Sequence, residues 1–458
     1  GTSTFVFSRI NAALFSNVGA MRLLVDNLFS PMMTFKVLCI LLSLTFAHQH
    51  SGVCDAATEL ACRRDNSTTI YEVGLETLTS LFGHVPIGWQ ENHMAYILAS
   101  ISEAGYGEIN RLSLEFDNAD NFGRAPIDVI VKRFRPKPLS NAPAGSMAAV
   151  EHDRHMRAFV VEAAAYVNLS RSLTEVGLAA PQLFFATEAY IDKPFTLLLE
   201  DISSKFPRGA NGELRHMSAA EISGAVRWLA GFHALFWEKA CVEERGLWSR
   251  GSYWHLDQLG LLELEGVPTG YKNRYISVDE WQRLRSAAKA IDRRLSGRPA
   301  SIEREKDTRF QTLLHGDAKP ENMLCSARSG MQVQCAALDF AWTGEGYGMY
   351  DIMYLLWGEY TQDIVDGYLG EYHDELLRNL GRRASEEYTP LVMRQHFELC
   401  VLDFIRWWAG FRKGEHFWAM PWALQIMREV LQRLDSGHLV SESEYAAAID
   451  REYPLDSY

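Results

Sequence analysis

The segment 313–340 holds residues of the types that phosphoryl transfer requires. It reads LLHGDAKPENMLCSARSGMQVQCAALDF, and two short apolar runs in it each lead to an acidic residue, Asp317 and Asp339. A carboxylate can orient an attacking hydroxyl and accept its proton, and oxygen ligands can hold magnesium against phosphates. The spacing predicts Asp317 as the base and Lys319 as a contact of the γ-phosphate. Asn322 and Asp339 would be the metal ligands, unless this is a polar loop whose Asp and Asn only form turns.

A lysine and a glutamate further upstream fit the nucleotide end of such a site. Lys132 lies in the apolar run VIVKRF, where an ammonium is costly unless it reaches a partner. Glu162 lies in a predicted helix and is the expected ion-pair partner. Strand alternation places two neighbouring arginines on the opposite face of the sheet. The competing charged residues are Arg133, Arg135, Glu151 and Asp153.

The catalytic segment resembles that of known small-molecule kinases. HGDAKPENML is similar to the catalytic loop of aminoglycoside phosphotransferases, choline kinases and the ecdysteroid kinase-like (CHK kinase-like) family, and to the HRDLKPEN loop of protein kinases. Three more segments resemble the ecdysteroid kinase-like group, namely FVVEAAAY (159–166), LLLEDI (197–202) and WLAGFHALFW (228–237). The resemblance covers about residues 70–410, and the combination favours this group over the aminoglycoside enzymes.

The resemblance implies a kinase that uses ATP and Mg²⁺ and has a two-lobed, protein-kinase-like α+β fold. A small antiparallel sheet would bind the nucleotide, and a larger, mostly helical lobe would carry the catalytic loop and the acceptor site. Lys132 would hold the α- and β-phosphates. A glycine turn at 102–110 would cover the phosphates, although it lacks a third glycine. The other implied nucleotide contacts are Gly105 and Gly107 in that turn and Glu200, Asp201 and Ile202 beside adenine.

Each of two residues outside the catalytic segment can be interpreted either as structural or as functional. Asp351 resembles the acidic residue that follows the motif in these kinases, and a helix N-terminal cap is the alternative. His233 lies in an apolar helical stripe, so we expect a hydrogen-bonded core histidine rather than a catalytic one.

The hydrophobic periodicity predicts the elements that must position these residues. Before residue 201 it predicts strands at 94–102, 112–116, 127–134, 183–190 and 195–200 and helices at 70–81 and 147–173. After residue 201 it predicts a helix that opens with a Ser218–Glu221 capping box and further helices at 278–295, 349–360, 363–380, 391–411 and 419–434. We therefore divide the chain into a leader (1–60), an N-lobe (61–201) and a C-lobe (202–458).

Composition limits the partners. The chain has 458 residues, 47% of them hydrophobic, so it can bury the cores of two or three lobes. Its net charge of −13 argues against nucleic acid, because an acidic surface repels a phosphate backbone. The expected partner is a small molecule that carries a hydroxyl. The seven cysteines show neither CxxC pairs nor zinc spacing, and we expect scattered thiols rather than disulfides.

The apolar run at 37–47 (VLCILLSLTFA) follows Lys36 and matches the core of a signal peptide, while eleven residues are too few to span a bilayer. A buried or interfacial helix is the alternative. Secretion conflicts with the use of ATP, which is mainly cytosolic, so a cytoplasmic location and export both stay open. The rest of the chain has no run long enough to span a membrane.

The acceptor should bind in the helical lobe. Residues 391–411 carry Asp403 and Trp407, followed by Trp418 and Trp422, which together could enclose a cation. We favour the alternative of a helix packed on both sides, with Asp403 paired to Arg406 or Arg394. The acceptor classes are a steroid, an amino alcohol such as choline, or an antibiotic-like compound. A pseudokinase that only binds nucleotide is the competing function, and the lack of an A-P-E element after residue 339 argues against a protein kinase.

Overall fold

The computed structural model describes residues 73–94, 106–116, 126–137, 142–143, 145–209, 216–260, 264–265, 274–303, 305–326, 332–381, 387–411 and 418–455. All described residues belong to one compact unit, Ala61–Tyr458. The leader and the apolar run at 37–47 lie outside the described residues. Within the ranges given, no helix combines the length and the hydrophobicity needed to cross a bilayer.

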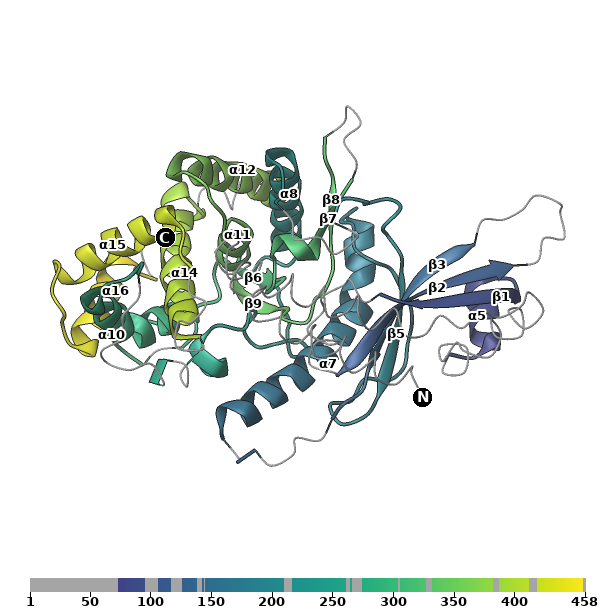
Figure 1. Ribbon diagram of the computed structural model, residues 1–458. Coiled ribbons are helices and arrows are strands. Elements are labelled where there is room, and N and C mark those ends of the chain that lie inside the picture. Colours follow the sequence, from purple (N-terminus) through teal and green to yellow (C-terminus); the bar gives the residue numbers. More distant parts are fainter. Residues whose placement is uncertain are drawn as a thin grey trace, which may run out of the picture. The chain divides into compact units, whose positions relative to one another are not determined.

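Five antiparallel strands form one sheet in the order β1-β2-β3-β5-β4 (Figure 1). They are β1 (Pro86–His93), β2 (Gly107–Phe116), β3 (Ile127–Phe134), β4 (Leu183–Ala186) and β5 (Phe195–Glu200). The predicted bounds of β3 and β5 are confirmed. The strand predicted at 94–102 lies outside the described residues except for Met94, which follows β1. Strand β1 itself, the polar segment PIGWQENH, was not predicted. It lies at the sheet edge, where a proline in the first position removes no necessary ladder hydrogen bond.

The two faces of the sheet pack against different helices, α5 (Leu75–Phe82) and α7 (Met147–Glu175). One face packs with Leu78 of α5 through Leu112, Leu114, Val129, Val131 and Leu198. On the other face Phe134 contacts Phe159 of α7, with the two ring centroids 5.0 Å apart. Because strand side chains alternate, Lys132 lies on the same face as Phe134 and faces α7.

The second lobe is mostly helical, as predicted. Its helices are α8 (Ala219–Leu235), η1 (Leu256–Gly260), α10 (Val278–Leu295), η2 (Pro320–Asn322), α11 (Met349–Leu355), α12 (Gln362–Leu380), α14 (Pro390–Gly410), α15 (Pro421–Asp435) and α16 (Glu442–Glu452). Two short antiparallel pairs join β6 (Gln311–Leu314) to β9 (Gly344–Tyr347) and β7 (Met323–Cys325) to β8 (Cys335–Ala337). The Ser218–Glu221 capping box is confirmed. The antiparallel sheet and the mostly helical second lobe confirm the predicted two-lobed α+β fold. The sequence analysis missed η1 and α16, although Ser441 and Glu444 form the same capping pattern at α16.

The expectation of scattered free thiols is wrong for one pair of cysteines. Cys325 and Cys335 form a disulfide across the β7–β8 hairpin, where the strand register places them opposite each other. Neighbours in such a register have close Cβ atoms, which suits a disulfide. Cys241 and Cys400 are free thiols.

Candidate active site

The loop after β6 brings three of the predicted catalytic residues together. Lys319 Nζ and Asn322 Nδ2 both donate to Asp317 Oδ2, at 2.7 and 2.9 Å. Asp317 Oδ1 is buried and has no hydrogen-bond partner among the described residues. Because the Asn322 amide donates through its nitrogen, its oxygen is left to accept from, or coordinate, another group. The loop therefore presents one free carboxylate oxygen and one amide oxygen.

A buried aspartate on α11 fixes the backbone of this loop. Asp351 accepts hydrogen bonds from the backbone N–H groups of His315, at 2.6 Å, and of Gly316, at 2.9 Å. Gly316 has a φ of 83°, and a Cβ there would lie 2.0 Å from the carbonyl oxygen of Trp342, so only glycine fits. The N-terminal cap of α11 is Gly348, so the capping interpretation of Asp351 is wrong, and its role is to support the loop.

His233 contributes to the same support. Its Nε2 lies 3.1 Å from Asp351 Oδ2 and its Nδ1 lies 2.9 Å from the Tyr372 hydroxyl. Both ring nitrogens have partners in the core, which confirms the expected hydrogen-bonded core histidine.

Asp339 follows β8 and lies close to the loop. Its carboxylate makes no hydrogen bond or ion pair with the described part of the chain, and its φ is 66°. The next residue, Phe340, packs between the rings of Tyr166 (centroids 5.4 Å apart) and His315 (5.0 Å). These two ring contacts link α7 to the catalytic loop and hold the backbone next to Asp339 between them.

The predicted ion pair in the N-lobe is present. Lys132 Nζ donates to Glu162 Oε1, and both side chains are almost entirely buried. Arg133 instead pairs with Glu91 and Glu108, which excludes it as the partner of Glu162. Burial acts to lower the pKa of Lys132, but Glu162 and then Asp339 outweigh it, so the pKa is raised and the lysine stays charged.

The candidate site holds more carboxylates than lysines. Burial raises the pKa of Asp317 to about 6, with Lys319 opposing and Asp339 adding to the shift. Burial likewise raises the pKa of Glu162 to about 7, with Lys132 opposing and Asp339 adding. Three carboxylates thus share the site with two ammonium groups, and a divalent cation would relieve their repulsion.

The available ligands fit magnesium held mainly by a nucleotide. Within the described ranges, no three His, Cys, Asp or Glu side chains cluster into a metal cage. Magnesium commonly binds through one or two carboxylates together with substrate phosphates and water. The unpaired carboxylate of Asp339 and the amide oxygen of Asn322 provide such a partial set of hard oxygen ligands.

The three residues expected beside adenine lie at and just after the end of β5. The Glu200 carboxylate accepts from Lys205 Nζ at 2.6 Å, and the Asp201 carboxylate accepts from Arg111 Nε at 2.6 Å. The Ile202 side chain packs in a small cluster with Leu324 and Ala336 of the β7–β8 hairpin. Because the acidic side chains are engaged, the backbone is the part of this segment left to meet a base, and its contact with adenine stays a prediction.

The glycine turn expected over the phosphates is only partly described. Gly107 is the first residue of β2 and pairs with Phe134, so the expectation that it lies in the turn is wrong. Strand β2 is longer than predicted because Ile109 and Leu112 are buried on the two faces of the sheet and extend the alternation toward Gly107. Gly105 lies outside the described residues.

A group of aromatic residues that the sequence analysis missed lies on the helical-lobe side of Asp317. The hydroxyls of Tyr253 and Tyr354 are 2.7 Å apart. Burial raises the pKa of both phenols well above the ordinary range, and the Asp317 carboxylate raises both further, which indicates that they share its surroundings. The Tyr253 ring also packs on Trp342 (5.1 Å) and Trp407 (5.3 Å).

The cation-enclosing alternative for α14 is wrong, and the packed alternative is confirmed. Asp403 is buried, its Oδ1 accepts from Arg406 at 2.6 Å, and its Oδ2 accepts from Tyr350 at 3.1 Å. Arg394 pairs instead with Asp366 and Glu398. Asp403 therefore has its charge balanced inside the protein and does not offer it to a ligand.

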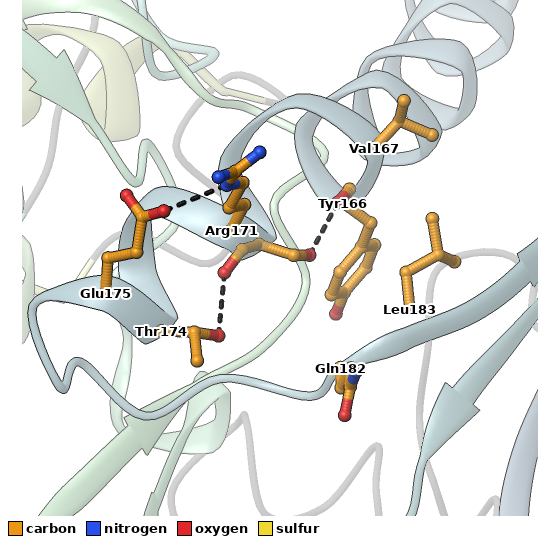
Figure 2. A pocket seen from close by; sticks show the side chains of 8 residues that line it. Tyr166, Val167, Arg171, Thr174, Glu175, Gln182 and Leu183 are labelled. Atoms are coloured by element: carbon orange, nitrogen blue, oxygen red, sulfur yellow. Dashed lines mark hydrogen bonds and ion pairs between the residues drawn. The ribbon is translucent and has the colours of Figure 1, made fainter.

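A cavity of about 390 Å³ lies elsewhere, at the C-terminal turns of α7 next to β4 (Figure 2). Figure 2 shows that it is lined by Tyr166, Val167, Arg171, Thr174, Glu175, Gln182 and Leu183, and Ser170 completes the lining. The Arg171–Glu175 pair at its rim is exposed, and such pairs contribute little. None of the candidate catalytic or nucleotide-binding residues lines this cavity.

Comparison with known proteins gives one family and a set of solved structures. The model of the ecdysteroid kinase-like family matches residues 102–383, which is more than half of the chain. The comparison with curated proteins gives no match.

Three of the similar solved structures are small-molecule kinases. A microcompartment-associated aminopropanol kinase is 12% identical, with 72% of this chain and 91% of that chain covered and a TM-score of 0.39. A choline kinase from Streptococcus pneumoniae is 12% identical, with 80% and 98% covered and a TM-score of 0.36. A spectinomycin phosphotransferase solved with ADP and spectinomycin is 10% identical, with 82% and 97% covered and a TM-score of 0.38.

Proposed function

Because this chain belongs to the ecdysteroid kinase-like family and is thus a small-molecule kinase, we propose that it transfers the γ-phosphate of ATP to a hydroxyl of a small metabolite, with Mg²⁺ as the metal. The observation that carries this proposal is the unpartnered oxygen of Asp317. A buried acceptor without a hydrogen bond is costly, so a substrate hydroxyl that donates to Asp317 Oδ1 removes that cost. Asp317 then orients the hydroxyl toward the phosphate and takes its proton.

The other residues of the site would bind the nucleotide and the metal. Glu162 holds Lys132 in place to meet the α- and β-phosphates, and Lys319 stays beside the transferring group. Asn322 and Asp339 would hold the metal. When bound there, Mg²⁺ would neutralise charge on the phosphates. The remaining proposed nucleotide contacts are Gly105 and Gly107 over the phosphates and the backbone of Glu200, Asp201 and Ile202 at adenine.

The aromatic group favours an uncharged acceptor. Tyr253 and Tyr354 offer hydroxyls and half-buried rings near Asp317, whereas the charge of Asp403 is balanced by Arg406. A cationic amino alcohol would find no free carboxylate in α14 to compensate its charge. Among the acceptor classes, we therefore place a steroid or another uncharged ring compound ahead of choline-like substrates.

Product formation tests the proposal. We expect the purified chain, given ATP and Mg²⁺, to phosphorylate at least one member of a panel of hydroxylated metabolites, with uncharged ring compounds ahead of amino alcohols. The measurement is the phosphorylated product by mass spectrometry, together with ADP release. Chelating the metal should stop the reaction. ATP binding without product across the whole panel would favour the pseudokinase, a nucleotide-binding or scaffold module.

We also propose the division into a leader (1–60), an N-lobe (61–201) and a C-lobe (202–458), with the acceptor bound by the last. The cellular compartment of the protein depends on whether the leader acts as a signal peptide. The Cys325–Cys335 disulfide suits an oxidising compartment, which supports a signal peptide at 37–47 over a cytoplasmic location.

A fluorescent tag at the C-terminus distinguishes the two locations. We expect the tagged chain to enter the secretory pathway. The apolar run at 37–47 would direct export, and cleavage after it would remove that run together with all residues before it. Microscopy and N-terminal sequencing are the measurements, and a chain that lacks residues 37–47 is the control. A diffuse cytosolic signal from the full chain would rule out the signal peptide and leave the cytoplasm.

A further inference from the structure

The Cys325–Cys335 disulfide closes the hairpin that carries both candidate metal ligands. Asn322 directly precedes β7, and Asp339 follows shortly after β8. At the ligand end, the Leu338 N–H donates to the Asn322 carbonyl at 3.1 Å, and at the other end the disulfide joins the two strands. Each strand has only three residues, and a two-stranded hairpin of that length is marginal without further support.

The disulfide lies in a packed junction rather than at the surface. Cys325 and Cys335 are 0% and 4% exposed. The backbone of Cys325 exchanges two hydrogen bonds of 3.0 Å with Arg208, in the segment that follows the hinge. On the other side, a Cβ added at Gly224 of α8 would lie 2.9 Å from Cys335 Sγ, so the helix packs directly on the disulfide. Movement of the hairpin is thus opposed from the hinge, from α8 and across its own strands.

We propose that the Cys325–Cys335 disulfide is a positioning element for the metal site, which holds Asn322 and Asp339 at the separation that a Mg²⁺-nucleotide needs. The inference rests on the proposed metal-binding function. Without the covalent link, the two strands are joined only by non-covalent contacts. These are three residue pairs, the Leu338–Asn322 hydrogen bond at the ligand end, and two hydrogen bonds between Ser326 and Gln334 beyond the disulfide, of 2.8 and 3.1 Å. Forming the bond removes one hydrogen from each thiol, and a disulfide such as oxidised glutathione accepts them and becomes two thiols. The reduced chain therefore binds the metal-nucleotide more weakly than the oxidised chain.

The test measures ADP binding by calorimetry, with Mg²⁺ and with a chelator, so that no acceptor is needed. The chain is compared in its oxidised form, after refolding in dithiothreitol with both thiols shown free by alkylation and mass spectrometry, and as the double variant Cys325→Ala/Cys335→Ala. We expect the gain in ADP affinity caused by Mg²⁺ to fall about tenfold in the reduced and double-variant chains, the lower end of what loss of support to a metal ligand costs. The metal-free affinity for ADP should stay the same. Peptide mapping should recover both cysteines in one linked fragment of the oxidised chain.

Two controls isolate the disulfide. Dithiothreitol should have no effect on the double variant, and Cys241→Ser, which changes an exposed free thiol, should behave as the unaltered chain. The reduced chain keeps every side chain, so it carries the test if the double variant does not fold.

Each contrary result overturns a distinct claim. A magnesium effect that survives reduction overturns the role of the disulfide alone. Equal losses with and without Mg²⁺ would show that the link supports only the fold. Free thiols at both Cys325 and Cys335 after oxidative folding would show that the disulfide does not form, and would overturn its proposed role. An oxidised chain that binds ADP with no magnesium effect overturns the proposed metal site, and the inference with it.

Discussion

Asp317→Asn should lower turnover on a verified acceptor by about 10²- to 10⁴-fold, the usual cost of losing a positioned base. The amide has the shape of the carboxylate, so it preserves packing in this buried site, but it cannot take a proton from the acceptor hydroxyl. Binding of ATP should change little, because the side-chain oxygen of asparagine can still accept the hydrogen bonds that Lys319 and Asn322 donate to Asp317. Steady-state kinetics on the acceptor and calorimetry with ADP measure the two effects separately.

The matched control is Asp374→Asn, the same change at an exposed aspartate on α12. It should leave turnover unaltered, because it lies on the solvent side of a helix. Turnover by Asp317→Asn equal to that of the unaltered chain would contradict the assignment of the base. The proposed mechanism would then need another proton acceptor.

The raised pKa of Asp317 adds a pH dependence with a defined sign. A base must be deprotonated to act, so kcat/KM should fall as the pH drops through the pKa of Asp317, which is about 6 without metal. Bound Mg²⁺ adds positive charge nearby and lowers this pKa, so the acidic limb should lie at or below about pH 6. Lys319 also lowers it, so Lys319→Met should move the limb to higher pH.

The parts of the site that the sequence predicted are those whose geometry is local. Asp317 and Asn322 are joined by one short turn, so the type and spacing of the residues already placed them together. The Lys132–Glu162 ion pair was predictable because a buried ammonium needs an acidic partner, and the helix that covers this face of the strand provides one. Their ion pair is confirmed, while the catalytic roles of all four residues stay predictions.

Contacts across longer stretches of chain were not predictable in the same way. Asp351 at the start of a helix looks the same in sequence whether it caps that helix or accepts from Gly316, 35 residues away. The Tyr253–Tyr354 contact spans 101 residues, and neither tyrosine belongs to a motif. Strand β1 was not predicted because it is a polar edge strand, whereas β3 and β5, which lie inside the sheet, show clear apolar runs.

Asp339→Asn should largely abolish the ability of Mg²⁺ to tighten ADP binding. Asparagine tolerates the left-handed backbone conformation at this position, where φ is 66°, better than alanine does, so the change removes charge without adding strain. Loss of a direct ligand should cost at least as much as loss of its support, which is about 10- to 100-fold in metal affinity. Calorimetry with ADP, with and without Mg²⁺, is the measurement.

The expected pattern separates the metal ligand from the base. Asp317→Asn should keep the magnesium effect and lose turnover. Asp339→Asn should lose both, because the phosphates of the nucleotide then have no bound metal to neutralise their charge. Metal-free ADP should bind Asp339→Asn at least as well as the unaltered chain, since one of the three carboxylates that repel the phosphates is gone. An unchanged magnesium effect in Asp339→Asn would show that this carboxylate does not hold the metal.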